Sequence, residues 1–279
     1  MMLSSELKWF TSDDGELAYR DEGAGHPVVL LHAGYLTHEM WDAQVPALAA
    51  DHRVIAPDAR GHGDSANASK PFRQTDDLAA LLRHLDIGPA VLVGISMGAG
   101  IAVDTALEHP ELAAGLVISG AGTSEPEYSD PWTLQIFTDQ ATAMATGDVE
   151  GWLSAALRSA PGPTREFADM DAELMCRIRE MTVRTVSKHT MDEDNVTVPV
   201  TDTWSRASRI TVPILAIHGA LDSPDLIGMA ERLVDNAPHG RSATIDGVAH
   251  YPNMERPDEF NALVREFLRD VYGAAPLTS

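Results

Sequence analysis

The sequence feature that most constrains the fold is a glycine-flanked serine, Gly94-Ile95-Ser96-Met97-Gly98, which follows an apolar run. The run, Ala90–Val93, is typical of a strand buried on both faces of a sheet. A helical pattern then extends from about Met97 to Glu108. A sharp passage from strand to helix strains the central residue, and a Cβ two positions before or after it would clash. The motif therefore predicts an exposed serine hydroxyl at a helix N-terminus, which favours developing negative charge.

Two other interpretations of this turn remain open. A glycine-rich turn can simply allow close packing between a helix and a strand. Gly94, Gly98 and Gly100 also suggest a dinucleotide loop, but their spacing departs from Gly-x-Gly-x-x-Gly. The strand before the serine and the helix after it favour a nucleophile.

Apolar runs alternate with helical patterns through much of the chain. A hairpin is predicted from Leu7–Thr11 and Glu16–Asp21, and further strands are predicted at Val28–Leu31, Arg53–Ala56, Ala90–Val93, Leu116–Ser119, Pro213–Ile217 and Ser242–Ile245. The last helix is predicted to begin at Pro257. This alternation predicts an α/β fold, with a mostly parallel central sheet flanked by helices.

The alternation breaks between about Thr123 and Ala207, where helical stretches occur without an apolar strand run. We interpret 123–207 as a helical cap, or lid, inserted into a core domain formed by 1–122 and 208–279. We expect the cap to cover the carboxyl ends of the strands, where sheets of this class bind ligands.

Composition excludes several function classes. The 279 residues contain 20 Lys and Arg against 42 Asp and Glu, a formal charge of −22, which argues against a nucleic-acid or anionic-membrane surface. The single cysteine, Cys176, allows no intrachain disulfide, and residues 1–10 lack the pattern of a signal peptide. No apolar stretch is long enough to span a bilayer. We expect a cytoplasmic protein, with a homodimer as an open alternative and with no metal or organic cofactor.

From about Glu16 to Val271 the chain resembles the α/β-hydrolase family. The resemblance rests on the Ser96 turn and on motifs that follow other predicted strands: Leu31-His32-Ala33-Gly34, the segment from Asp58 to Ser65, Gly219-Ala220-Leu221-Asp222 and Ala249-His250. It implies the fold and the catalytic machinery of that family, in which the acid and then the histidine follow the serine in the chain. It says little about the substrate.

That chain order limits the candidates for the base. After Gly219-Ala220-Leu221-Asp222 only His239 and His250 remain, and His239 precedes a predicted strand that His250 follows. We therefore expect His250, at the same sheet edge as Ser96, to act as general base and then as general acid.

The acid has four candidates, Asp222, Asp225, Asp235 and Asp246. Asp222 comes a short turn after Pro213–Ile217, at the carboxyl edge, and we expect it to orient the imidazole of the base. The alternative acid position, after Leu116–Ser119, is occupied by Gly120-Ala121-Gly122 and carries no carboxylate.

The oxyanion hole needs two backbone donors. Met97, directly after the nucleophile, is expected to supply one. The resemblance implies that the other comes from the turn after Val28–Leu31, where Gly34 is the expected donor and Ala33 remains open. We interpret His32, Asp58 and Arg60 as structural supports for these turns.

We expect six large side chains to line a substrate pocket beneath the cap: Tyr35, Leu36, Ile95, Trp132, Trp152 and Tyr251. An apolar cap of this kind indicates a substrate with a hydrophobic acyl or alcohol portion. Large apolar cap residues can instead form the interior of the cap itself. Cys176 is expected to be inert packing in the cap.

Together these residues predict a serine hydrolase that cleaves a carboxylic ester or lactone through an acyl-enzyme, with a small molecule as its substrate. The same groups could serve a thioesterase, a C–C bond hydrolase or an acyltransferase. A catalytically silent ligand receptor and a cofactor-free oxygenase or lyase are alternatives from other classes.

Overall fold

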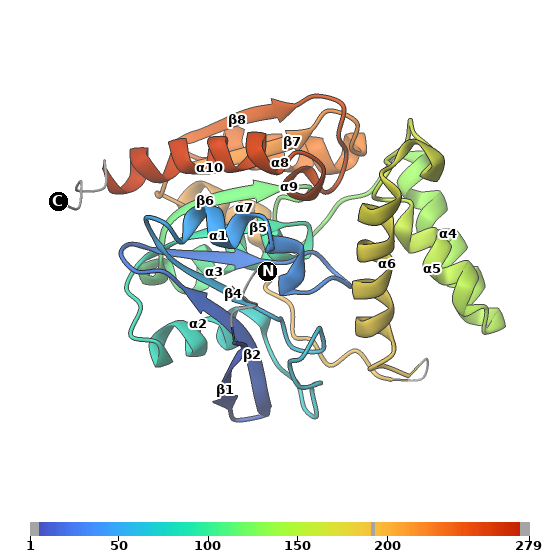
Figure 1. Ribbon diagram of the computed structural model, residues 1–279, viewed down its shortest axis with the longest axis horizontal. Coiled ribbons are helices and arrows are strands. Elements are labelled where there is room, and N and C mark those ends of the chain that lie inside the picture. Colours follow the sequence, from blue (N-terminus) through green and yellow to red (C-terminus); the bar gives the residue numbers. More distant parts are fainter. Residues whose placement is uncertain (1–5, 191–192, 274–279) are drawn as a thin grey trace.

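The computed structural model describes residues 6–190 and 193–273, so residues 1–5 of the segment considered for a signal peptide lie outside it. One sheet of eight strands runs through the molecule in the order β1-β2-β4-β3-β5-β6-β7-β8 (Figure 1). The strands are β1 (Lys8–Ser12), β2 (Gly15–Glu22), β3 (Pro27–Leu31), β4 (Arg53–Pro57), β5 (Ala90–Ile95), β6 (Ala113–Ser119), β7 (Ile214–Gly219) and β8 (Gly240–Ile245). Strand β2 is antiparallel to both β1 and β4, and the other neighbours are parallel.

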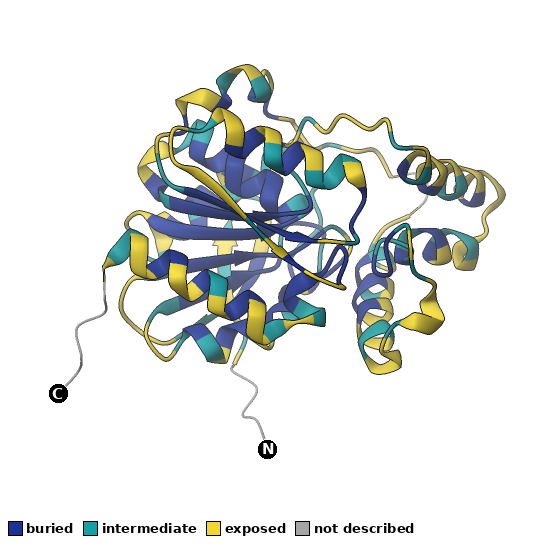
Figure 2. Ribbon diagram, turned by 90° about the horizontal axis from the view of Figure 1, so that it is seen from above, coloured by how far each residue is buried: buried dark blue, intermediate teal, exposed yellow. Residues whose placement is uncertain are grey.

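Helices cover both faces of this sheet, as Figure 2 shows by the buried strands between half-exposed helices. Strand β3 shows why, since Val29 and Leu31 join one apolar cluster while Val28 and Leu30 join another. The first cluster receives α2 (Gln74–His84), α3 (Met97–Glu108) and α8 (Pro224–Asn236). The second receives α1 (Gln44–Leu48) and α10 (Pro257–Tyr272). The α/β fold with a mostly parallel sheet is confirmed.

The predicted strands and the last helix are observed close to their expected bounds. The short helices α1 and α9 (Pro252–Glu255) were not predicted. Each is too short to show a helical repeat of apolar residues, which is the signal on which the prediction depended.

Between β6 and β7 the chain forms helices rather than strands: α4 (Pro131–Thr146), α5 (Val149–Leu157), α6 (Ala172–Val186) and the short α7 (Thr203–Arg206). Figure 1 shows α4, α5 and α6 grouped beside the sheet and its flanking helices. Each of these three begins after an aspartate whose carboxylate accepts from a backbone N–H of the first turn: Asp130, Asp148 and Asp171. Helix α7 lies on the core, beside α3. Among the described residues, no helix is both long and apolar enough to cross a membrane.

Candidate active site

The Ser96 backbone is strained at the turn between β5 and α3. Its φ of 53° and ψ of −116° lie in a region that side-chain-bearing residues rarely adopt. The neighbouring glycines make the turn possible, because a Cβ on Gly94 would lie 2.2 Å from the Gly98 carbonyl oxygen. A Cβ on Gly98 would lie 2.1 Å from the carbonyl oxygen of Leu31. Close contact between the start of α3 and the end of β3 therefore fixes where the serine stands.

His250 and Asp222 form a buried hydrogen-bonded pair. The imidazole Nδ1–H donates to Asp222 Oδ2 at 3.0 Å, and the Ser223 N–H donates to the other carboxylate oxygen at 2.8 Å. The two residues are only 5% and 6% exposed, so water competes little for this bond. Asp246, by contrast, is exposed beyond the end of β8, and His239 is exposed before its start.

Gly120 connects this pair to Ser96. The Ser96 N–H donates to the Ser119 carbonyl at 2.8 Å, which holds the serine beside the end of β6. The next residue, Gly120, has a φ of +64°, and a Cβ on it would lie 2.6 Å from Cε1 of His250. The imidazole of His250 therefore packs against Gly120, the neighbour of Ser119, and so lies close to Ser96. The structure brings Ser96, Asp222 and His250 to one edge of the sheet.

The turn after β3 lies against the start of α3. A Cβ on Gly34 would be 3.8 Å from Cβ of Met97, so the two expected oxyanion donors are neighbours. The Ala33 N–H already donates to Met40 Sδ at 3.2 Å, which favours Gly34 over Ala33 as the second donor. The Met97 N–H lies in the first turn of α3, where helical N–H groups have no carbonyl partner within the helix.

His32 supports this turn rather than facing a substrate. Its Nε2 accepts from the Ala59 N–H at 2.9 Å, so Nδ1 carries the proton and donates to the Ala33 carbonyl at 2.8 Å. Burial lowers the pKa of His32, which keeps the ring neutral. The ring thus ties the turn after β3 to the turn after β4.

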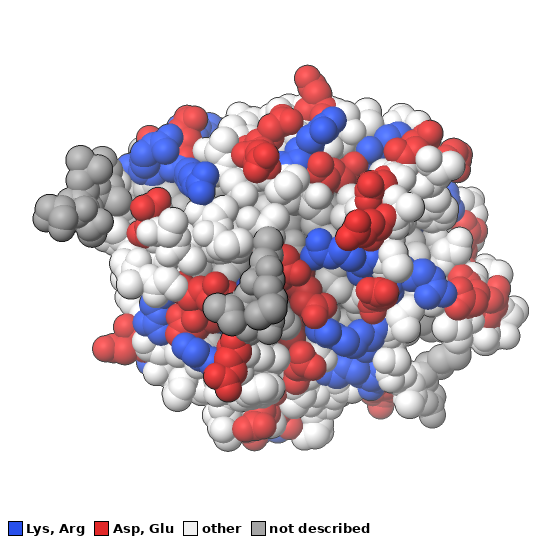
Figure 3. Space-filling model, viewed as in Figure 1, with Lys and Arg blue, Asp and Glu red and all other residues white. Residues whose placement is uncertain are grey.

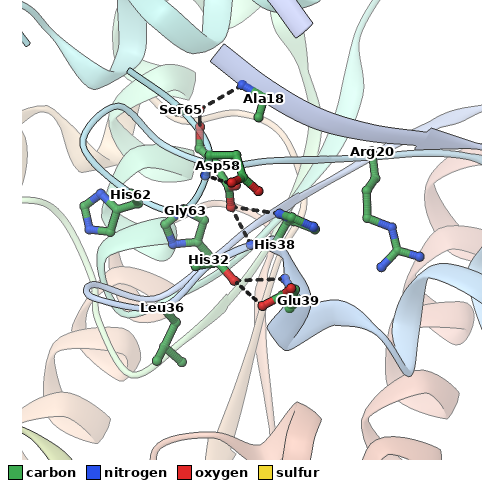
Figure 4. Close-up of polar contacts among 12 residues, drawn as sticks. Ala18, Arg20, His32, Leu36, His38, Glu39, Asp58, His62, Gly63 and Ser65 are labelled. Carbon is green, nitrogen blue, oxygen red and sulfur yellow. Dashed lines mark hydrogen bonds and ion pairs between the residues drawn. The ribbon is translucent and has the colours of Figure 1, made fainter. Parts of the chain in front are cut away.

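Asp58 is the second support, at the centre of the contacts in Figure 4. Its Oδ1 accepts from the His38 N–H at 2.7 Å, and Oδ2 accepts from the Asp64 N–H at 2.9 Å. Its carbonyl accepts from the Ser65 hydroxyl at 2.6 Å. Burial alone would raise the pKa of Asp58, but the contact with the His38 side chain and the hydrogen bond from the Asp64 N–H lower it to about 2. Asp58 is therefore a fixed negative charge that joins the two turns.

The end of α6 is joined to the same turn by Lys188. Its ammonium group donates to the carbonyls of Gly63 at 2.9 Å, His62 at 3.4 Å, and Ser65. The turn after β4 thus connects the helical segment with the turn that carries Gly34. No sequence motif pointed to this lysine.

The expected pocket residues occupy different environments. Leu36, Ile95 and Tyr251 are buried, Trp132 and Trp152 are half-buried, and Tyr35 is 45% exposed. The Tyr35 and Trp152 rings meet edge to face at 5.0 Å, which links the turn after β3 to α5. The expected packing role of Cys176 is wrong, because its side chain is exposed on α6.

Two contacts join the helical segment to the neighbours of His250, and no sequence motif pointed to them. The Ser159 hydroxyl lies 3.3 Å from the Tyr251 hydroxyl, and the Tyr251 ring packs edge to face on His250 at 5.0 Å. A Cβ on Gly162 would lie 2.3 Å from the Leu221 carbonyl oxygen and 2.8 Å from Cβ of Ala249. The segment after α5 therefore rests on the neighbours of both Asp222 and His250.

Within the described residues, no group of three or more His, Cys, Asp or Glu side chains is arranged to hold a metal ion. The polar groups that converge near Ser96 are instead a hydroxyl, an imidazole, a carboxylate and backbone amides. Such a set is suited to acyl transfer by a serine nucleophile.

Comparison with known proteins identifies the family of this chain. Residues 28–263 match the alpha/beta hydrolase family. A 2-hydroxy-6-oxononadienedioate/2-hydroxy-6-oxononatrienedioate hydrolase of Burkholderia vietnamiensis is 30% identical over 263 residues, which cover 90% of each chain. A bromoperoxidase from Bacillus anthracis superposes with a TM-score of 0.80 at 25% identity, covering 96% of this chain and all of the other. Est816, an N-acyl homoserine lactone degrading enzyme, gives a TM-score of 0.75 at 26% identity, covering 93% and 100%. The chain belongs to the alpha/beta hydrolase family.

Proposed function

We propose that this hydrolase cleaves a carboxylic ester or lactone through an acyl-enzyme, with Ser96 as nucleophile, His250 as base and Asp222 as acid. The observation that carries the proposal is the Nδ1–H···Oδ2 bond of 3.0 Å between His250 and Asp222. It leaves Nε2 as the ring nitrogen that can take a proton from a serine hydroxyl. The helices between β6 and β7 would act as the cap over this site.

In the first half of the reaction Ser96 Oγ attacks the carbonyl carbon while His250 takes its proton. The carbonyl oxygen becomes an oxyanion, which the N–H groups of Gly34 and Met97 would stabilise. The bond to the alkoxide then breaks, and His250 gives its proton to the leaving alcohol. In the second half His250 takes a proton from water, the hydroxide attacks the acyl-serine, and the carboxylic acid leaves as Ser96 regains its proton.

Est816, the N-acyl homoserine lactone degrading enzyme among the structural neighbours, is compatible with cleavage of a lactone ester bond, and the Burkholderia relative supports C–C hydrolysis as a second candidate. Both reactions can use the same three side chains. A silent receptor is disfavoured because a hydrogen-bonded His–Asp pair beside a strained serine is costly to keep without chemistry.

A fluorophosphonate probe tests the proposal. We expect one covalent adduct, mapped by mass spectrometry to Ser96, and none in Ser96→Ala or His250→Ala. Both variants should remain folded by circular dichroism and should lose roughly six orders of magnitude in turnover, because the three residues act as a unit. A folded wild-type protein that takes up no probe and hydrolyses neither p-nitrophenyl esters nor lactones would point to a receptor.

A further inference from the structure

Two pairs of aromatic rings flank the candidate active site. The first is Tyr35 with Trp152, beside the oxyanion turn. The second is Tyr128 with Phe137, whose rings meet edge to face at 4.8 Å. Tyr35 is 45% exposed and Phe137 42% exposed, so both pairs offer apolar surface that the fold does not cover.

The second pair is held near Asp222. The Thr133 hydroxyl lies 2.7 Å from the hydroxyl of Ser223, the residue whose N–H binds the Asp222 carboxylate. Phe137 lies one helical turn after Thr133 and so on the same face of α4. The Ser129 N–H, next to Tyr128, donates to Asp225 at 2.7 Å. Thus one aromatic pair adjoins the oxyanion turn and the other adjoins the acid turn.

The turns around Ser96 supply no free cation. The sequences 32–37, 94–98, 119–124, 219–225 and 246–253, which follow or end β3, β5, β6, β7 and β8, contain no Lys or Arg. The connection from β4 to α2 contains three basic residues, and each of them pairs with a carboxylate: Arg60 with Asp77, Lys70 with Asp13 and Arg73 with Glu108. The core therefore offers no basic side chain from these turns to a substrate carboxylate.

The helical segment does not supply one either. Residues 123–207 contain seven Lys and Arg against 15 Asp and Glu. Lys188 donates to backbone carbonyls, and the other six pair with carboxylates: Arg158, Arg165, Arg177, Arg179, Arg184 and Arg206. Figure 3 shows the same mixing on one face, where basic groups lie next to acidic ones. The excess of acidic groups repels anions.

From these contacts we propose that the site selects uncharged substrates, with an aryl or alkyl group packed against the pairs Tyr35–Trp152 and Tyr128–Phe137. Esters that carry a free carboxylate would be poor substrates. This inference rests on the proposed function. A carboxylate placed against these rings would lose water without gaining a partner. The chain would differ here from its Burkholderia relative, whose named substrates are dioates.

The test compares two esters with acyl chains of equal length, p-nitrophenyl hexanoate and mono-p-nitrophenyl adipate. We expect kcat/KM to be about 10- to 100-fold higher for the uncharged hexanoate. This factor lies within the range by which a cleft lined with charges of one sign changes the association rate of a charged substrate. Raising NaCl from about 0.01 M to about 1 M shortens the distance over which charges repel each other. It should therefore raise kcat/KM for the adipate and reduce the difference between the two esters. Equal values, or a preference for the adipate, would overturn the inference while leaving the proposed function intact.

Variants separate the aromatic wall from general effects. Phe137→Ala should raise KM for the hexanoate by about tenfold, which corresponds to about 1.4 kcal/mol, because the acyl chain loses its contact with the ring. Phe167→Ala is the matched control, because the exposure of Phe167 is similar to that of Phe137 and Phe167 belongs to neither aromatic pair. Phe137→Arg supplies the missing cation and should shift the ratio towards the adipate. An unchanged KM in a folded Phe137→Ala protein would remove that residue from the wall. Hydrolysis of neither ester, with Ser96 unlabelled by the fluorophosphonate, would overturn the proposed function and this inference with it.

Discussion

Gly120 and His250 are in such close contact that a methyl group on the glycine would lie 2.6 Å from Cε1 and 2.8 Å from Nδ1 of the imidazole. The φ of +64° at Gly120 adds a second reason for a glycine at this position. Gly120 thus helps to position the imidazole of His250, although it has no side chain of its own.

We therefore expect Gly120→Ala to displace the imidazole and to lower kcat by about 100-fold, the scale of loss for a misplacement of about 1 Å. Gly228→Ala is the control, because nothing lies within 4 Å of the added methyl group and the residue is helical. That variant should keep full activity and gain up to about 1 kcal/mol of stability. Steady-state kinetics and thermal unfolding of both proteins provide the measurement. Wild-type kcat in Gly120→Ala would contradict the contact.

The assignment of the acid predicts unequal effects of two substitutions. Asp222→Asn removes the acceptor that orients His250, and kcat should fall by about 10⁴ if the serine-protease precedent holds. Asp246→Asn alters an exposed residue and should leave kcat within about twofold. Ester hydrolysis by the two purified variants decides the matter, and a reversed order would move the acid to Asp246.

Asp104 predicts a dependence of stability on pH. It is 3% exposed on α3 and accepts hydrogen bonds from the Ser124 hydroxyl and N–H. Burial raises the pKa of Asp104 to about 6, against the opposing hydrogen bonds. Because the folded protein binds this proton more tightly than the unfolded chain, the group costs stability as pH rises from about 4 to about 6, and the cost is complete above that range.

Asp104→Asn should remove that cost. We expect the free energy of unfolding to rise by up to about 3 kcal/mol at pH 8, with the gain disappearing near pH 4. Urea unfolding at both pH values measures it, with exposed Asp235→Asn as the control. A gain of the same size at both pH values would show that the carboxylate is not its source.

Lys188 predicts a stability effect that an exposed lysine does not share. Its ammonium group is held by three backbone carbonyls, so Lys188→Met leaves these acceptors without their donor. We expect a loss of about 1–3 kcal/mol in urea unfolding. Lys8→Met, which removes an exposed ion pair with Asp21, should cost less than about 1 kcal/mol. Equal losses in the two variants would argue against this anchor.

The sequence was sufficient for the sheet, because the central strands are mostly apolar and the serine turn needs glycines at fixed positions. It was sufficient to favour Asp222 and His250 as well, since parallel strands bring their carboxyl ends to one edge. Cys176 does not pack in the interior because it lies on the exposed face of α6. Ile178, two residues later, is buried, and two residues separate opposite faces of a helix.

Other features depend on distances that no local pattern encodes. The choice between Ala33 and Gly34 was open in the sequence and turns on the Met40 sulfur, seven residues along the chain, which occupies the Ala33 amide. In the sequence, Gly120 is notable only because it occupies the alternative position of the acid, where it supplies no carboxylate. Its contact with His250 joins residues 130 positions apart, and only the folded sheet edge reveals it.

Gly162 has a consequence for protein engineering. Transplanting the helices of another hydrolase onto this sheet would be a natural way to seek new substrates. A donor whose equivalent residue carries even a methyl group would wedge apart the loops bearing Leu221 and Ala249. Such a chimera could fold in both halves and still be inert, so the junction after α5 belongs with the recipient rather than with the graft.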